Sequence, residues 1–352
     1  MVRHCFWLVF AAAALAGQEA DERSLSGSRS QTQACDAARS ERLASQARAA
    51  ATEPVAAAAL LGLARQACPE LVEFLLERAR LLAEHGEHEL AIQAADEYLE
   101  EAPRSVPGLE VKANSELMAQ RFESALETAD ETLRRAPRSS SALKVRGNAL
   151  YFLGEAAGAE SAFLQLLDMH PADTAAAYML GRIYYQENRF ELAAAQFQKV
   201  IRLEPRSFKA YDNLALCYEA LGDAENAVRH YLAAIDLARS EQPDYDWPYA
   251  NLANLLIDGN DPQRGFDAAA TAAKLNPGSA RNFFLAGKAL TRLGRHREAL
   301  QWLEQSAALD ADYAEPLYLL GQAYKRLGDD ESARRALAAF ESVKARQPDE
   351  IR

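Results

Sequence analysis

The stretch that decides the fold is LGRIYYQENRFELAAAQF, residues Leu180 to Phe197. It combines a Leu-Gly pair, two tyrosines, an Asn and three alanines before an aromatic residue, which fits either a binding site or one copy of a repeat. Composition does not decide between them, because 49% hydrophobic and 26% charged residues describe almost any soluble chain of 352 residues. The spacing of similar residues along the rest of the chain does decide.

Three columns of residues recur every 34 positions, and after a slip of four residues near 240–245 the same spacing resumes. The first column is Pro69, Pro103, Pro137, Pro171, Pro205, Pro243 and Pro277. The second is Ala91, Ala125, Ala159, Ala193, Ala227, Gly265, Ala299 and Ala333. The third is Gly86, Gly154, Asn188, Gly222, Asn260, Gly294 and Gly328, with Gln120 as an exception.

Each column has a physical meaning. Small residues held in register indicate close contact between helices. Gly and Asn tolerate the positive φ that ends one helix before a tight turn into the next, and Pro stops the second helix. Each 34-residue unit is therefore predicted to be a pair of helices joined by a tight turn. In the unit that contains the opening stretch, the two helices are expected over about 173–187 and 190–203.

The arrangement resembles the tetratricopeptide repeat family, whose 34-residue signature has Leu-Gly, Tyr, Ala, an aromatic residue and a closing Pro. The matching residues in one unit are Leu180, Gly181, Tyr184, Ala193, Phe197 and Pro205. The resemblance implies an all-α solenoid, a right-handed superhelix of antiparallel helix hairpins with a concave groove. We expect a divergent N-terminal hairpin over 35–71 as a cap, eight repeats over 72–347 with a short insertion near 240–245, and a tail over 348–352.

Three positions depart from the pattern. Arg78, Lys112 and Arg146 stand where later units have Leu, so we expect their alkyl stems to pack and their charges to point outward.

The start of the chain predicts export. The apolar run from Cys5 to Leu15 follows a basic start and precedes small residues, which is typical of a signal peptide over 1–16. Residues 17–34 are rich in Ser, Gln and charge, and predict a disordered linker. No later segment is apolar for about 18 residues without a charge, so we expect a secreted or periplasmic protein that is peripheral to the membrane at most.

The cysteines are consistent with export. Cys35 and Cys68 lie at the two open ends of the expected front hairpin, where antiparallel helices bring their termini together. In an oxidising compartment these two residues would form a disulfide, the alternative being two unpaired small apolar side chains.

The sequence offers little chemistry for catalysis. With 51 acidic and 39 basic residues the chain repels nucleic acid. We find no Gly-rich phosphate loop, nucleophile motif or paired-Cys zinc spacing, and expect no catalytic residue, cofactor or metal. The histidines of His85-Gly86-Glu87-His88 straddle a predicted turn and do not share a helix face. A metal-dependent or glycan-modifying enzyme remains the alternative class.

The resemblance places peptide ligands along the first helices of successive units, which predicts a non-catalytic scaffold that binds a peptide or protein segment. The expected groove residues are Lys144, Asn148, Tyr151, Phe152, Tyr178, Arg182, Tyr185, Lys209, Asn213, Asn251, Arg281, Lys288, Arg292, Lys325 and Arg326. Tyr151, Phe152, Tyr178 and Tyr185 act as apolar anchors in this interpretation, and in the alternative Tyr151 and Tyr185 only pad a neighbouring helix. A scaffold of a periplasmic envelope-assembly or polysaccharide-export machine is the alternative function.

Two groups within this set have expected roles. Asn213 and Asn251 occupy equivalent places in adjacent units and would hold the backbone of a bound peptide through their amides. The five basic residues from Arg281 onward would make the C-terminal groove electropositive, suited to an acidic peptide or an anionic polysaccharide, unless they are ordinary solvated charges. The family's carboxylate clamp is incomplete, because Asp212 and Leu216 replace its last Lys and Arg.

Overall fold

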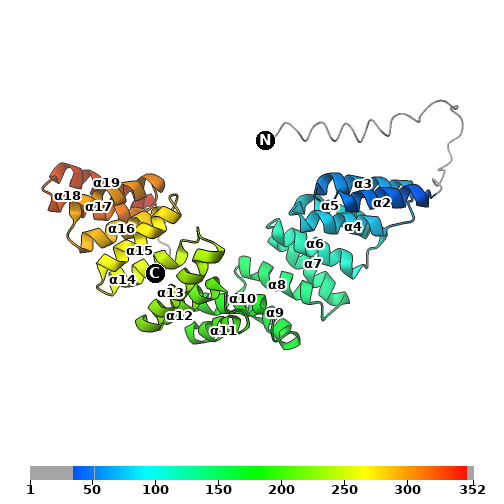
Figure 1. The fold of residues 1–352 in the computed structure, drawn as a ribbon, viewed down its shortest axis with the longest axis horizontal. Helices are drawn as coiled ribbons and strands as arrows, with labels where there is room; N and C mark the ends of the chain where they lie inside the picture. Colours follow the sequence, from blue (N-terminus) through cyan, green and yellow to red (C-terminus); the bar gives the residue numbers. More distant parts are fainter. Residues whose placement is uncertain (1–34, 51, 347–352) are drawn as a thin grey trace, which may run out of the picture. The chain divides into compact units, whose positions relative to one another are not determined.

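The computed structural model describes residues 35–50 and 52–346, and over these ranges its regular structure is entirely helical (Figure 1). The predicted signal peptide, linker and tail lie outside the described residues. The helices are α2 (Ala37–Ala49), α3 (Pro54–Ala67), α4 (Glu73–Glu84), α5 (His88–Glu101), α6 (Val106–Met118), α7 (Phe122–Arg135), α8 (Ser140–Phe152), α9 (Ala156–Met169), α10 (Thr174–Gln186), α11 (Phe190–Leu203), α12 (Phe208–Ala220), α13 (Ala224–Glu241), α14 (Trp247–Asp258), α15 (Pro262–Leu275), α16 (Ala280–Arg292), α17 (His296–Leu309), α18 (Ala314–Arg326) and α19 (Asp330–Arg346).

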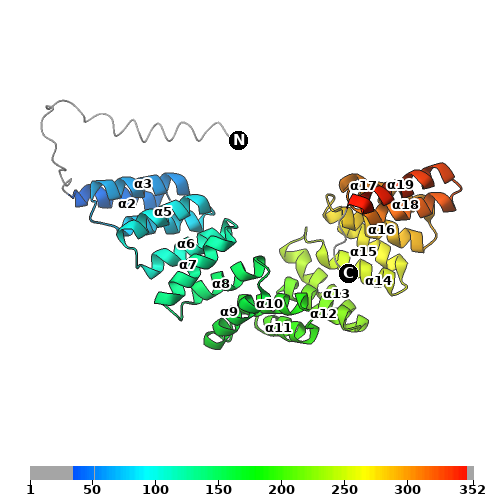
Figure 2. The ribbon, with the colours of Figure 1, turned by 180° about the vertical axis from the view of Figure 1, so that it is seen from behind.

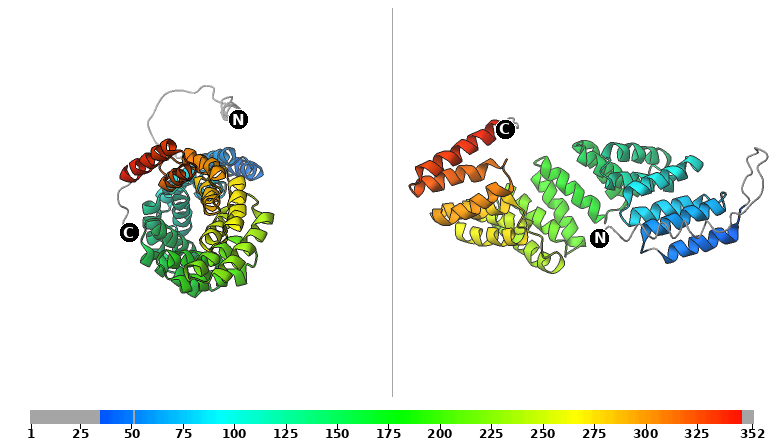
Figure 3. Two further views of the ribbon diagram at one scale, coloured as in Figure 1. Left: turned by 90° about the vertical axis from the view of Figure 1, so that its left-hand side faces the viewer. Right: turned by 90° about the horizontal axis from the view of Figure 1, so that it is seen from above.

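The chain divides into two units, which meet within α9: unit 1 ends at Leu166 and unit 2 begins at Leu167. In each unit successive helices form antiparallel pairs that stack on one another (Figures 2 and 3). The first helices of neighbouring pairs also contact each other directly, α4 with α6 and α6 with α8 in unit 1, and α10, α12, α14, α16 and α18 in sequence in unit 2. We call the surface that they form in each unit its first-helix face.

The predicted hairpins form where the column spacing places them. The helices expected over about 173–187 and 190–203 span Thr174–Gln186 and Phe190–Leu203. Ala193 in the small-residue column is fully buried, and a Cβ on Gly181 would lie 2.9 Å from the ring of Phe197. The Leu-Gly pair is thus explained by an aromatic ring of the second helix, which leaves no room for a side chain at the Gly.

The turn column is conformationally uniform. Its glycines have positive φ, and so do Asn188 at 58° and Asn260 at 66°. Gln120, the exception in residue type, adopts the same left-handed conformation at φ 61°. The reason is that each turn has the same backbone hydrogen bond, in which the residue after the turn residue donates its N–H to the carbonyl five residues earlier. In the Gln120 turn this bond runs from the Arg121 N–H to the Glu116 carbonyl at 2.8 Å.

The three departures from the Leu column find carboxylate partners on second helices. Arg78 pairs with Glu97 at 2.8 Å, and Lys112 pairs with Asp96 at 2.6 Å. Arg146 pairs with Asp130 at 2.8 Å. The basic side chains are 24–29% exposed and their partner acids 43–50% exposed, so the stems pack and the charges end in ion pairs at the surface, in agreement with the prediction.

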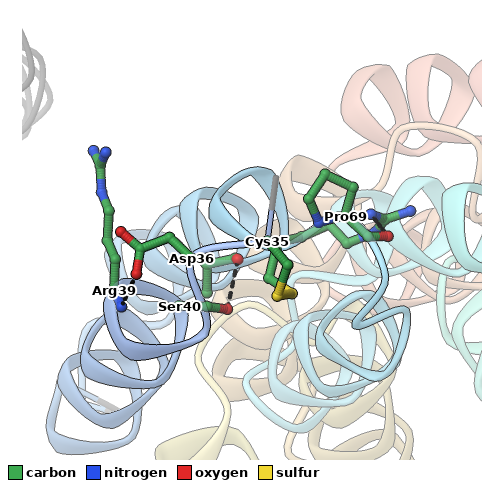
Figure 4. The surroundings of a disulfide bond; sticks show 8 residues. Cys35, Asp36, Arg39, Ser40 and Pro69 are labelled. Carbon is green, nitrogen blue, oxygen red and sulfur yellow. Dashed lines mark hydrogen bonds between the residues drawn. A yellow bond between two sulfur atoms is a disulfide. The ribbon is translucent and has the colours of Figure 1, made fainter. Parts of the chain in front are cut away.

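In the front hairpin, the residues before α2 are joined to the residues at the end of α3 (Figure 4). The structure bonds the sulfurs of Cys35 and Cys68, whose Cα atoms lie 4.1 Å apart. Two hydrogen bonds join the same ends: the Asp36 N–H donates to the Ala67 carbonyl at 2.8 Å, and the Ser40 hydroxyl donates to the Ala64 carbonyl at 2.7 Å.

Within the described ranges, no helix has both the length and the apolar character needed to cross a membrane.

Candidate peptide-binding faces

The first-helix face of unit 1 holds a cavity of about 460 Å³. It is lined by Arg80, Ala83 and Glu84 of α4, Pro107, Glu110, Val111 and Asn114 of α6, and Ser141 of α8. Three successive first helices therefore contribute to one hollow. The sequence interpretation missed it, because the predicted groove began at Lys144; counting back 34 residues at a time from Asn148 would have found Asn114 and Arg80.

A group of apolar side chains lies at the ends of α6 and α8 and at the start of the second helix α7. Phe152 is 54% exposed and stacks on Phe122 with ring centroids 4.6 Å apart, while Tyr151 meets Phe152 edge-on at 5.4 Å. Met118, at the equivalent position of α6, is 56% exposed. Met118 follows Asn114 by four residues, and Phe152 follows Asn148 by four, so Met118 and Phe152 lie on the same face of the first helices as the cavity. We call Met118, Phe122, Tyr151 and Phe152 the apolar cluster of unit 1.

Lys144 and Asn148 lie next to this cluster on α8. The Asn148 amide donates to the Lys144 carbonyl at 2.8 Å, so one of its donors is used along its own helix. Both side chains are half-buried.

The predicted aromatic anchors of unit 2 pack against second helices. Tyr178 meets Phe197 edge-on at 5.5 Å, and Tyr185 meets Phe190 at 5.4 Å. Both are half-buried, and burial raises the pKa of the Tyr185 hydroxyl. They pad the neighbouring helix while keeping part of each ring on the face, and Arg182 lies half-buried between them in α10.

The two predicted backbone grips instead join neighbouring first helices. The Asn213 amide donates to the Tyr178 hydroxyl at 3.0 Å and to the Lys209 carbonyl at 2.8 Å. One repeat later the Asn251 amide donates to the Asp212 carboxylate at 3.1 Å. Because Asn251 is only 5% exposed and its oxygen accepts from Arg281 at 3.0 Å, the prediction that it holds a peptide backbone is wrong.

Asp212 is the centre of a buried polar network that the sequence interpretation did not foresee. Its carboxylate is 3% exposed and also accepts from the Tyr245 hydroxyl at 3.3 Å. Burial raises its pKa to about 6, although the bonds from Asn251 and Tyr245 and the charge of Arg281 act in the opposite direction.

The residue that precedes α14, just after the insertion, supplies a second part of this network. Asp246, buried just before α14, accepts from the Asn282 amide at 2.6 Å and from the Asn276 amide at 3.4 Å. Through Tyr245 and Asp246, the segment before α14 is therefore hydrogen-bonded to both α12 and α16.

The late basic residues differ in their partners. Lys288 and Arg292 both reach Asp258, at 2.9 Å and 3.7 Å, so one carboxylate offsets part of the positive charge expected at these two positions. Lys325 and Arg326 are exposed in the last turn of α18. Lys209 is exposed near the start of α12, with its ammonium 5.8 Å from the Phe208 ring centroid.

The histidines flank the turn between α4 and α5. His85 caps α4 and bonds the Leu81 carbonyl at 2.8 Å, and His88 is the first residue of α5. Across residues 35–50 and 52–346 there is no group of three or more His, Cys, Asp or Glu side chains placed to hold a metal ion.

Comparison with known proteins gives repeat matches along most of the chain. A tetratricopeptide repeat profile matches residues 54–106, 111–174, 144–205 and 178–242. A TPR repeat profile matches 287–328, and another tetratricopeptide repeat profile matches 317–349.

Individual relatives are distant. A CTR9 homolog of Arabidopsis thaliana is 24% identical over 286 residues, which cover 70% of this chain and 26% of that protein, so this chain spans about a quarter of its length. The solved APC/C hetero-tetramer Cut9-Hcn1 aligns with a TM-score of 0.58 at 16% identity, over 77% of this chain and 52% of that one. A tetratricopeptide repeat protein from Parabacteroides merdae aligns with a TM-score of 0.55 at 17% identity, over 76% and 98%. The structural alignments support the fold, and at these sequence identities they do not indicate which partner this chain binds.

Proposed function

The chain belongs to the tetratricopeptide repeat family, and from this we propose that it is a non-catalytic interaction scaffold that binds a peptide or protein segment on its first-helix faces. The observation that carries the proposal is the cavity of unit 1, which three successive first helices line and which shares its face with the exposed side chains of Met118 and Phe152.

Cavity and cluster complement each other as binding elements. The apolar cluster offers rings whose transfer out of water is favourable by roughly 25 cal/mol per Å². Phe152 is already held by its stack on Phe122, so little side-chain entropy would be lost when a partner covers it. Asn114 is exposed in the cavity, and its amide offers donors and an acceptor to a peptide backbone.

We further propose that the protein works in an oxidising compartment after export. The paired cysteines at the open end of α2 and α3 and the signal-peptide pattern over 1–16 support this location.

Crosslinking in the native cell followed by affinity capture tests the binding proposal. We expect the wild-type chain to recover a defined set of partners, and a Met118→Ala/Phe152→Ala variant to lose them. Leu164→Ala is the matched control, because Leu164 is an equally apolar and exposed side chain of unit 1 that lies on the second helix α9. Recovery of the same set by wild type and double variant would contradict binding at the apolar cluster, as would an equal loss in the control.

A further inference from the structure

Trp247 is an exposed aromatic residue on a fixed backbone. It opens α14 and is 55% exposed on the first-helix face of unit 2. The residue before it, Asp246, is buried and bonded to Asn282 and Asn276. The start of the helix is therefore anchored while the indole remains available to a partner. Exposed Trp is among the residues that contribute most to binding energy at protein interfaces.

Arg281 lies against this indole in a defined orientation. Its guanidinium carbon is 5.7 Å from the Trp247 ring centroid, and its Nη2 donates to the Asn251 oxygen at 3.0 Å. Asn251 cannot turn freely, because it is buried and its own amide donates to Asp212. The Asn251 bond uses one of five guanidinium N–H groups, and the planar fork is suited to bidentate binding of a carboxylate.

The surrounding charges favour an acidic ligand. Lys209, Trp247 and Arg281 occupy the same register on α12, α14 and α16, counting the four-residue insertion, and the exposed Glu315 continues this register on α18. The indole therefore lies between two basic positions, with an acidic position only beyond Arg281. Lys288 and Arg292 share Asp258, whereas Arg281 donates to a neutral amide. Asp212 is near Arg281 but buried, so it cannot occupy the surface in front of the guanidinium.

We infer that Trp247 and Arg281 form a receptor site for an acidic segment of a partner protein, in which a carboxylate binds Arg281 and an adjacent apolar side chain covers Trp247. This inference rests on the proposed function and adds to it the chemistry of the ligand. The site also depends on the segment that follows the insertion, since Tyr245 and Asp246 support the residues that hold the indole and the guanidinium.

Fluorescence anisotropy with a labelled synthetic peptide tests the inference on the full chain. Neighbouring first helices lie about 8–10 Å apart and an extended peptide advances about 3.3 Å per residue, so a Gly-Glu-Leu triplet repeated three times presents one carboxylate per helix. We expect this peptide to bind the wild type, and the matched Gly-Gln-Leu peptide to bind at least tenfold more weakly. Equal binding of the two peptides would overturn the inference.

Variants locate the binding. Arg281→Gln and Trp247→Ala should each weaken binding of the acidic peptide at least tenfold, and Arg281→Lys should give an intermediate loss because it keeps charge without the planar fork. Arg229→Gln, at an exposed arginine of the second helix α13, should change nothing. Unchanged affinity in Arg281→Gln refutes the site. If that variant unfolds by circular dichroism, the comparison of the two peptides on wild type still decides.

Two outcomes separate this inference from the function on which it rests. If captured partners depend on Met118 and Phe152 while the wild type ignores the acidic peptide, the Trp247 site is wrong and the scaffold proposal stands. If a uronic acid polymer binds in an Arg281-dependent way and the acidic peptide does not, the ligand is a polysaccharide and the inference of a protein segment fails.

Discussion

Replacing Gln120 by Gly should stabilise the hairpin of α6 and α7. Gln120 has φ 61° and closes the same turn that Gly154 closes one repeat later at φ 79°. The left-handed conformation costs a residue with a Cβ roughly 1–2 kcal/mol, and the extra freedom of Gly in the unfolded chain returns roughly 0.4–1 kcal/mol of that. The net expectation is a gain of about 0.5–1 kcal/mol.

Hydrogen exchange measured by mass spectrometry is the appropriate assay, because repeat arrays need not unfold in one step. Peptides of α6 and α7 should exchange about two- to fivefold more slowly in Gln120→Gly, from the Boltzmann factor of about 0.5–1 kcal/mol. Gly154→Ala is the matched control: nothing lies within 4 Å of its added Cβ, so only the backbone strain changes and exchange in α8 should accelerate by a similar factor. Faster exchange in Gln120→Gly, or no change in Gly154→Ala, would refute the assignment of strain to the turn.

Three further predictions concern unit 2 and the front hairpin. Burial raises the pKa of Asp212 from 3.8 in the free side chain to about 6 in the folded chain, so the ionised carboxylate destabilises the fold above pH 6 and this penalty disappears as the pH falls. Hydrogen exchange in α12 and α14 should show a gain in opening free energy of about 1 kcal/mol from pH 7 to pH 5 in the wild type, and no gain in Asp212→Asn. Native protein, alkylated after denaturation without reductant, should carry no label at Cys35 or Cys68, and the Cys35→Ser/Cys68→Ser variant should lose about 3 kcal/mol in urea unfolding of the front hairpin; label on either native cysteine would exclude the bridge. Asp258→Asn should release Lys288 and Arg292 and increase the affinity for the acidic peptide about two- to fivefold in anisotropy titrations at low salt, an effect that 0.5 M salt should remove; a salt-independent increase would indicate a different cause.

The repeat register was predictable because each column answers to a single local constraint. Gly181 must leave room for the ring of Phe197, and Asn188 must accept a positive φ; both requirements act within one hairpin and recur in every repeat. Such constraints restrict residue type directly, so they are visible in one sequence without knowledge of the wider packing.

The state of each candidate site residue was less predictable, because it depends on which side chain the neighbouring helix presents. Asn213 and Asn251 have the same register, and each donates to the residue of the same column on the preceding first helix. For Asn213 that residue is Tyr178, and the amide stays half-exposed; for Asn251 it is Asp212, and the amide is buried. The sequence shows equivalent asparagines, but only the pairing between helices distinguishes a surface amide from a structural one.

The same pairing links stability to recognition in unit 2. The insertion lengthens the second helix α13 to Glu241 and leaves α13 and α14 with a smaller contact than the other successive helices of the unit. Hydrogen bonds of the Asp212 network span this junction and connect the helices on its two sides, since Asp212 precedes it while Asn251 and Arg281 follow it. A buried polar network of this kind is favourable only when all its members are satisfied, so the residues that hold the helices together must also hold the Arg281 guanidinium in one orientation. A partner that binds Arg281 should therefore slow hydrogen exchange in α12 as well as in α16, although α12 supplies only Lys209 to the surface that it touches.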